Sequence, residues 1–335
     1  MKVDAGLMTT LDQVPATARR LEEEGFDGAI TAETSNDPFF PLVLAAEHTE
    51  RIELMTSIAV AFARNPMVLA NIGNDLQAFS KGRFILGLGS QIKPHVTKRF
   101  SMGWSHPAAR MREFILAMRA IWDCWYEGQP LAFRGEYYTH TLMTPMFTPT
   151  NNAYGPPRVL LAAVGPRMTE VAGETADGML VHAFTTAKYL SEVTVPAIER
   201  GLEAGGRKRS DFEVSYPAFV VSGSDEKAWE ATRSGICKQI AFYGSTPAYK
   251  GVLEMHGWGE LQAELNALSK QGQWDEMGSR ISDEILEAFA VVTEPHRIAG
   301  ELKKRFGDTV DRVFCTFPFA SPEDQRAFIE ELHAG

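Results

Sequence analysis

Short apolar runs alternate with longer amphipathic stretches over most of the chain. The short runs have the length of buried strands, and the longer ones repeat apolar residues at the spacing of one helix face. The runs that we predict to be strands lie at residues 3–7, 28–31, 52–57, 83–88, 158–162, 178–181, 212–221 and 312–317. Predicted helices follow them at residues 14–25, 38–50, 66–80, 108–126, 168–175, 189–203, 295–306 and 322–332. This alternation is typical of a parallel sheet covered by helices.

Two segments interrupt the alternation. Residues 128–157 are rich in glycine, proline, threonine and aromatic residues, which indicates a short hairpin and a covering loop. Residues 223–290 contain mainly helix-forming sequence and are longer than one crossover between strands requires. We therefore predict one closed (β/α)8 TIM barrel over residues 1–335, with both insertions at its C-terminal face. An open, doubly wound sheet is the alternative, but it leaves the strand at 312–317 without an obvious position.

Composition and charge narrow the classes of function. The chain has 335 residues, of which 44% are hydrophobic and 23% charged, so it can bury a large core. Its formal net charge of -10 argues against a nucleic-acid partner, which requires a basic face. A few local donors can still bind an anionic cofactor. The three cysteines include no C-x-x-C pair, so neither disulfides nor a metal site is expected. The chain opens without a signal-like region and has no apolar run of about 18 residues, so we predict a cytoplasmic protein without a membrane partner.

In a barrel of this kind the active site lies where the carboxyl ends of the strands meet. Glu33 follows the second strand and is a candidate proton donor or acceptor; the plainer interpretation is that Asn36 or Asp37 caps the next helix. After the third strand an apolar run continues without charge as far as Arg64. This arginine is a candidate ligand for a carboxylate or phosphate, or one half of an ion pair. Its place beside a helix amino terminus requires a partner.

A glycine pair and a basic loop follow the fourth strand. Gly87 and Gly89 permit close approach of a ligand to the backbone, although the third glycine of a dinucleotide fingerprint is missing. The loop carries four basic residues on an acidic protein: Lys93, His95, Lys98 and Arg99. We interpret this loop as part of the site, with an ordinary solvated loop as the alternative.

The fifth and sixth strands end in a candidate anion site and a histidine. Small residues up to Gly165 lead directly into a helix, whose free amides and dipole attract a phosphate. Arg167 would add a charge-assisted hydrogen bond. His182 stands at the end of the sixth strand, where it is either a proton donor or a hydrogen-bonded structural residue.

Several motifs occur in the order seen in one enzyme family. They are Asp4-Ala5-Gly6-Leu7, Glu24-Gly25-Phe26-Asp27-Gly28, Thr56-Ser57-Ile58, Ser80-Lys81-Gly82-Arg83 with the strand after it, and Ala176-Asp177-Gly178. The chain thereby resembles the luciferase-like monooxygenases over nearly its whole length. Two further motifs make it most similar to the branch of oxidoreductases that use the deazaflavin coenzyme F420: Gln91-Ile92-Lys93-Pro94-His95 and Leu142-Met143-Thr144-Pro145.

The resemblance implies an oxidoreductase that transfers a hydride between F420 and a small organic substrate, either an alcohol or carbonyl compound or an activated double bond. An FMN-dependent monooxygenase that uses reduced flavin and O2 is the alternative, and a non-catalytic ligand-binding barrel is a third hypothesis. The resemblance also implies a non-prolyl cis peptide at Ser57-Ile58, against which the ring lies, and a phosphate site at residues 164–167. The cofactor-binding residues so implied are Ser57, Ile58, Ala59, Arg64, Gly89, Ser90, Gln91, Ala163, Val164, Gly165, Pro166 and Arg167. Homodimers are common among the relatives, so a homodimer is expected.

One position departs from the family pattern. Sugar-phosphate dehydrogenases of the family carry a glutamate just after the glycines of the fourth strand, and Ile92 stands nearest that place here. The resemblance therefore does not extend to glucose-6-phosphate oxidation. The candidates for moving a proton are Glu33, His95 and His182.

Overall fold

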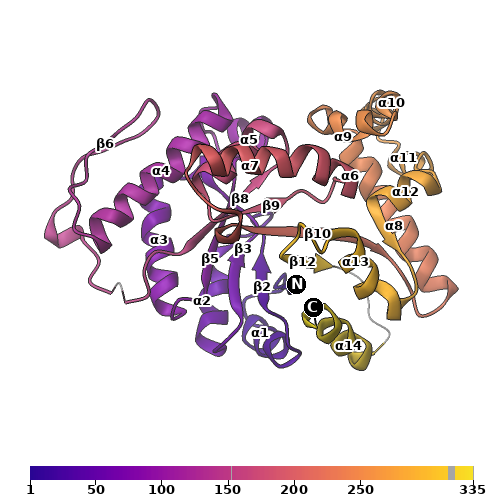
Figure 1. Cartoon of the computed structure of the whole chain (residues 1–335), viewed down its shortest axis with the longest axis horizontal. Helices are drawn as coiled ribbons and strands as arrows, with labels where there is room; N and C mark the ends of the chain where they lie inside the picture. Colours follow the sequence, from indigo (N-terminus) through magenta and orange to yellow (C-terminus); the bar gives the residue numbers. More distant parts are fainter. Residues whose placement is uncertain (152, 316–320, 335) are drawn as a thin grey trace.

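The chain folds into a closed parallel barrel surrounded by helices (Figure 1). The computed structural model describes residues 1–151, 153–315 and 321–334. Eight strands form the barrel: β1 (Lys2–Gly6), β2 (Gly28–Thr31), β3 (Glu53–Thr56), β5 (Phe84–Gly89), β8 (Arg158–Ala163), β9 (Gly178–Val181), β10 (Glu213–Val221) and β12 (Arg312–Cys315). β10 pairs with both β9 and β12, and β12 pairs with β1, so the sheet closes on itself. The predicted TIM barrel is confirmed. Residues 316 and 317 of the last predicted strand lie outside the described residues.

The helices between the strands cover the outside of the barrel (Figure 1). They are α1 (Val14–Glu23), α2 (Phe39–His48), α3 (Pro66–Phe79), α4 (Pro107–Tyr126), α5 (Pro166–Thr175), α7 (Val195–Ala204), α13 (Ile298–Phe306) and α14 (Pro322–His333). Each packs an apolar stripe against the strands, as α1 does with Val14, Ala18 and Leu21. Among the described residues, no helix combines the length and hydrophobicity that a membrane span requires.

The helix predicted at 189–203 is divided. The short helix α6 (Ala187–Tyr189) leads into a π-helical turn at residues 190–194, and α7 begins only after it. Pro196 lies in the first turn of α7 and has no backbone N–H to donate to the preceding turn. The hydrogen-bond pattern therefore changes just before this proline.

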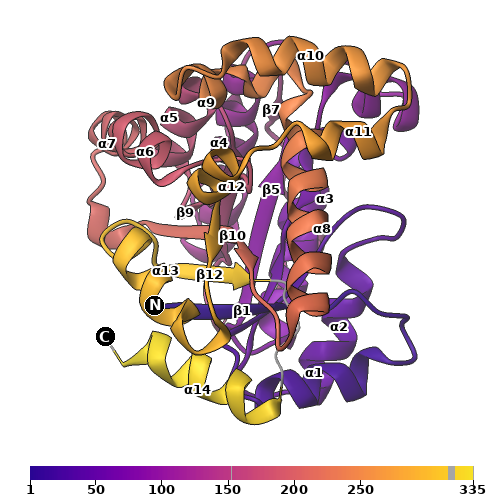
Figure 2. The ribbon, with the colours of Figure 1, turned by 90° about the vertical axis from the view of Figure 1, so that its right-hand side faces the viewer.

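The long insertion is a set of helices grouped at one end of the barrel (Figures 1 and 2). It contains α8 (Glu226–Gly244), a 3-10 turn (Pro247–Tyr249), α9 (Lys250–Met255), α10 (Gly259–Lys270), α11 (Trp274–Ser279) and α12 (Asp283–Phe289). These helices bury a hydrophobic cluster that includes Ile240, Leu265 and Phe289 and that also contains Phe219 and Val221 of β10. The insertion ends in β11 (Ala290–Val292), a strand that was not predicted, which pairs with residues 219–221 of β10.

The shorter insertion lies along the outside of α4. It forms the antiparallel hairpin of β6 (Phe133–Arg134) and β7 (Thr139–His140), with a loop on each side (Figure 1). The carboxylate of Glu113 in α4 accepts the backbone N–H groups of residues 136–138, and Arg110 donates to the hydroxyl of Tyr138 at 2.8 Å. These contacts fasten the hairpin to the first half of α4.

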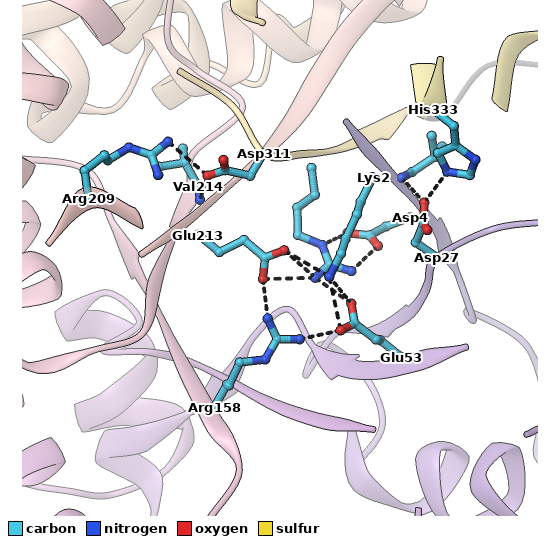
Figure 3. Close-up of polar contacts among 12 residues, drawn as sticks. Lys2, Asp4, Asp27, Glu53, Arg158, Arg209, Glu213, Val214, Asp311 and His333 are labelled. Atoms are coloured by element: carbon cyan, nitrogen blue, oxygen red, sulfur yellow. Dashed lines mark hydrogen bonds and ion pairs between the residues drawn. The ribbon is translucent and has the colours of Figure 1, made fainter. Parts of the chain in front are cut away.

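Charged residues fill the amino end of the barrel (Figure 3). Arg312 and Asp4 are completely buried there and form a bidentate ion pair with distances of 2.7 and 2.6 Å. Around them Glu53 and Glu213 pair with Arg312, Arg158 and Lys2, so three carboxylates face three cations. Although burial raises the pKa of the Glu53 carboxyl, the charges of Arg312, Arg158 and Lys2 hold that pKa below its ordinary value. Above this layer the barrel interior is apolar, with Ile30, Met55, Ile85, Leu160 and Leu180 in contact.

Candidate active site

A cavity of about 710 Å³ opens at the carboxyl ends of the strands. Its floor is the top of the barrel interior, where Ile30, Leu180 and Phe314 line it. The long insertion supplies a second wall with Tyr243 and Tyr249. The strand ends and the insertion therefore enclose one space, which is the position expected for the active site of a TIM barrel.

A kink in the backbone after β3 forms one side of this cavity. The peptide bond between Ser57 and Ile58 is cis, as predicted, and both residues line the cavity. The chain then continues as the short strand β4 (Ala59–Val60), which pairs with the end of β5. Ala59 is fully buried behind the cavity wall. The kink thus turns Ser57 and Ile58 toward the space above the barrel.

The glycines of β5 make room for this kink. A methyl group on Gly87 would lie 1.7 Å from the carbonyl oxygen of Thr56, and one on Gly89 would lie 2.2 Å from the Cδ1 atom of Ile58. Close approach to a ligand was the predicted reason for the pair. The structure shows that the neighbouring backbone and side chain already occupy that space, although Gly89 also lines the cavity.

Glu33 and Arg64 support the kink from behind. One carboxylate oxygen of Glu33 accepts the N–H of Val60 at 2.7 Å and an N–H of Arg64 at 2.6 Å. Arg64 also pairs with Asp37 at 3.0 Å, and Asp37 accepts the backbone N–H of Phe39 at the start of α2. The partner expected for Arg64 is therefore found. Neither Glu33 nor Arg64 is among the described residues that line the cavity.

The end of β8 and the amino terminus of α5 form another side of the cavity. Ala163, Val164 and Gly165 line the cavity, and Gly165 is the N-cap residue of the helix. No side chain caps this helix, and no atom lies within 4 Å of the position where a Cβ of Gly165 would stand. Pro166 has no N–H, and the N–H of Met168 donates to the carbonyl oxygen of Gly165 at 3.1 Å, so in the first turn the N–H of Arg167 is the one without an intrahelical acceptor. Pro166 and Arg167 are exposed and lie outside the cavity lining.

The basic loop is only partly at the site. Ser90, Gln91, Ile92 and Lys93 line the cavity, whereas His95 is exposed and lies outside the lining. Of the described residues that line the cavity, Lys93 is the only one with a permanent charge.

His182 lies inside the cavity wall. Its Nδ1 atom accepts the backbone N–H of Phe184 at 3.0 Å, and its Nε2 atom lies 3.3 Å from the hydroxyl of Tyr249. The imidazole ring packs edge-on against Tyr243, with 4.7 Å between the ring centroids. Burial lowers the pKa of His182 to about 4, so the ring is neutral at pH 7.

The sequence did not indicate the residues that the long insertion brings to the cavity. Gln239, Tyr243, Ala248 and Tyr249 all line it, and none was predicted to be functional. Aromatic residues at helical spacing are as typical of a helix core as of a binding site. The only available signal was the place of the insertion, directly after a strand end.

Comparison with known proteins agrees with this geometry. The family model described as luciferase-like monooxygenase matches residues 2–312. An uncharacterized protein of Mycobacterium tuberculosis is 56% identical over 332 residues, which cover 99% of this chain and 98% of that protein. A 5,10-methylenetetrahydromethanopterin reductase of Archaeoglobus fulgidus is 29% identical over 306 residues, or 89% and 87% of the two chains. The solved structure of the coenzyme F420 dependent tetrahydromethanopterin reductase from Methanopyrus kandleri matches with a TM-score of 0.78 at 22% identity, over 99% of this chain and 98% of that one. The chain belongs to the luciferase-like monooxygenase family.

Proposed function

We propose that the protein is an F420-dependent oxidoreductase that transfers a hydride between the deazaflavin and a small organic substrate. One observation carries the proposal: the Ser57-Ile58 kink and the amino terminus of α5 border the same cavity. A flat ring system with a phosphate-bearing chain requires both an apolar backing and an anion site. The Methanopyrus kandleri reductase, whose fold the chain shares, is described as dependent on coenzyme F420, and this description supports F420 as the cofactor.

The residues present fit such a group. Ser57 and Ile58 would hold the ring. The start of α5 at Gly165 would hold the phosphate, because the helix dipole is positive there and the N–H of Arg167 has no intrahelical acceptor. When bound, F420 supplies the hydride chemistry, while the chain positions the substrate and excludes water. Of the three proposed proton-handling residues, His182 lines the cavity, Glu33 holds the kink, and His95 lies outside the lining. We therefore assign Glu33 a positioning role.

An FMN-dependent monooxygenase is the second candidate. The description of the matched family favours it, because that description names monooxygenases. FMN also combines a flat tricyclic ring with a phosphate, so the same two cavity walls suit it.

Titration of the purified protein with F420 and, separately, with FMN tests the proposal, with calorimetry as the readout. We expect F420 to bind at least tenfold more tightly than FMN. Gly165→Glu should weaken F420 binding at least tenfold, since it places a carboxylate in the anion site. Gly235→Glu makes the same change of charge in an open position on α8 and should leave binding unchanged. Preferential binding of FMN would establish the monooxygenase hypothesis instead, and binding of neither cofactor would favour a non-catalytic barrel.

We also propose a homodimer formed through barrel helices. Phe40 and Val43 of α2 and Phe79 of α3 expose 64%, 41% and 50% of their surface. Val43 and Phe79 line one shallow depression between these neighbouring helices. A second copy of the chain would remove this apolar surface from water.

A further inference from the structure

The end of the cavity formed by the long insertion has a distinct chemical character. Phe219, Tyr243, Tyr249 and the neutral His182 line it, together with Gln239. Lys93, at an exposed position on the basic loop after β5, is the one permanently charged residue among the described lining residues. The residues of the aromatic wall themselves therefore supply no counter-charge to a carboxylate or phosphate.

Two hydrogen bonds connect Phe184, His182 and Tyr249 in this wall, and the donor and acceptor of each can be assigned. A neutral imidazole carries a single N–H, and Nδ1 of His182 already accepts the N–H of Phe184. The proton of His182 therefore sits on Nε2, which faces the hydroxyl oxygen of Tyr249 at 3.3 Å. His182 donates and Tyr249 accepts.

The hydroxyl hydrogen of Tyr249 is then free to point elsewhere. Burial raises the pKa of Tyr249, so the hydroxyl stays protonated at pH 7. The ring is fixed by His182 and by Phe184, with centroid distances of 4.6 and 5.9 Å. The backbone is fixed as well, since the N–H of Tyr249 donates to Thr246 at 3.0 Å within the 3-10 turn.

We propose that the hydroxyl of Tyr249 donates a hydrogen bond to the oxygen of an uncharged carbonyl or alcohol ligand, and that His182 is the positioning residue that orients this hydroxyl. The inference rests on the proposed function, because it assigns the substrate end of the same cavity. It restricts the substrate to neutral, largely apolar molecules with one oxygen acceptor. We expect a carboxylate of the same size to bind more weakly, because it would be desolvated against wall residues that carry no positive charge.

Three probes that share a phenylethyl group test the preference for a neutral oxygen. They are 4-phenyl-2-butanone, the carboxylate 3-phenylpropanoate and the hydrocarbon butylbenzene, and binding is measured by calorimetry. The ketone should bind at least tenfold more tightly than the carboxylate. Equal or tighter binding of the carboxylate overturns the proposal.

Variants test the donor chain. Tyr249→Phe should weaken binding of the ketone about tenfold and leave that of butylbenzene unchanged, whereas Tyr154→Phe, at an exposed tyrosine outside the cavity lining, should change neither. His182→Gln retains an N–H donor and should keep most of the ketone affinity, while His182→Leu should lose it. If Tyr249→Phe weakens butylbenzene binding equally, the tyrosine acts by packing and the proposal fails.

Calorimetry with F420 on the same variants separates the two proposals. We expect Tyr249→Phe to bind F420 as the unaltered protein does. Ketone selectivity without any F420 binding would overturn the proposed function but support the donor chain. F420 binding without ketone selectivity would support the proposed function but overturn the proposal for Tyr249 and His182.

Discussion

Gly87 in β5 lies beside Thr56, the last residue of β3, whose hydroxyl is hydrogen-bonded to the backbone of Gly87. A methyl group there would meet the carbonyl oxygen of Thr56 at 1.7 Å, and backbone cannot move aside as a flexible side chain can. We predict that Gly87→Ala lowers the free energy of unfolding by at least about 3 kcal/mol, at the upper end for overpacked sites. Urea denaturation measures this change.

The matched control is Gly235→Ala. Gly235 lies in the middle of α8 with no atom within 4 Å of a Cβ, so alanine should raise the free energy of unfolding by about 0.5–1 kcal/mol. Equal effects of the two alanines would show that the close contact at Gly87 relaxes without cost.

His182 should make stability depend on pH. Its pKa is about 4 in the folded protein and 6.5 as its ordinary value, so the unfolded chain binds more protons between these limits. Stability from this residue is complete above pH 6.5 and is lost progressively as the pH falls toward 4. Between pH 7 and pH 5 the loss is about 2 kcal/mol. In His182→Gln the difference in unfolding free energy between these pH values should shrink by that amount, and an undiminished difference would contradict the prediction.

Single residues show what a sequence can and cannot reveal. The helix amino terminus at Gly165 was predictable from a few consecutive residues, whereas the cis peptide at Ser57-Ile58 was expected only because the chain resembles a known family. The role of Glu33 was not predictable, since its partners Val60 and Arg64 are 27 and 31 residues away. The role of Tyr249 was not predictable either, because Tyr249 is 67 residues from His182 in the sequence and the two meet only in the folded protein.

At the scale of elements, Glu33 connects the end of β2 with β4 and the turn before α3. Its side chain is only 7% exposed and that of Arg64 15%, so water screens this ion pair weakly. We predict that Glu33→Gln lowers the free energy of unfolding by about 2 kcal/mol, because Arg64 retains only Asp37 as a charged partner. It should also weaken cofactor binding by loosening the kink. Thermal denaturation and calorimetry with F420 check the two effects.

Glu254→Gln is the control for this change. Glu254 pairs with Lys250 on the surface of α9, where both side chains are about half exposed, so the loss should be about 0.3–0.5 kcal/mol. If Glu33→Gln lowers the free energy of unfolding no more than Glu254→Gln does, the positioning role of Glu33 is contradicted.

The elements themselves were predictable to different degrees. β2 and β9 begin and end at the predicted residues, because buried parallel strands are short apolar runs between polar residues. β11 was missed because three apolar residues that continue from the core face of α12 have no pattern of their own. The pairing of residues 219–221 with this strand depends on the tertiary fold.

At the scale of the whole molecule, the charged layer closes the amino end of the barrel. Asp4→Asn removes one carboxylate from beside the fully buried Arg312 and should lower the free energy of unfolding by about 3–5 kcal/mol. Asp4→Leu combined with Arg312→Met leaves Lys2 and Arg158 balanced by Glu53 and Glu213. The double variant should therefore be more stable than Asp4→Asn, as urea denaturation would show; a less stable double variant would contradict this interpretation.

The proposed dimer predicts a change of mass. Light scattering should give twice the mass of one chain, and Phe79→Asp should shift the population toward the single chain, because it places a charge in the apolar surface between α2 and α3. Leu142→Asp, at an exposed leucine beside the hairpin, is the control and should leave the mass unchanged. If the unaltered protein has the mass of a single chain, the proposed homodimer is wrong.

The two walls of the cavity come from separable parts of the chain. The kink and the α5 terminus are built on barrel strands, whereas Tyr243 and Tyr249 stand on the long insertion, whose hydrophobic cluster also contains Phe219 and Val221 of β10. Changes in the insertion that keep its contacts with β10 would leave the kink, the α5 terminus and the charged layer untouched. In the proposed enzyme, ligand preference can therefore diverge through the insertion while the walls proposed to bind the cofactor stay the same.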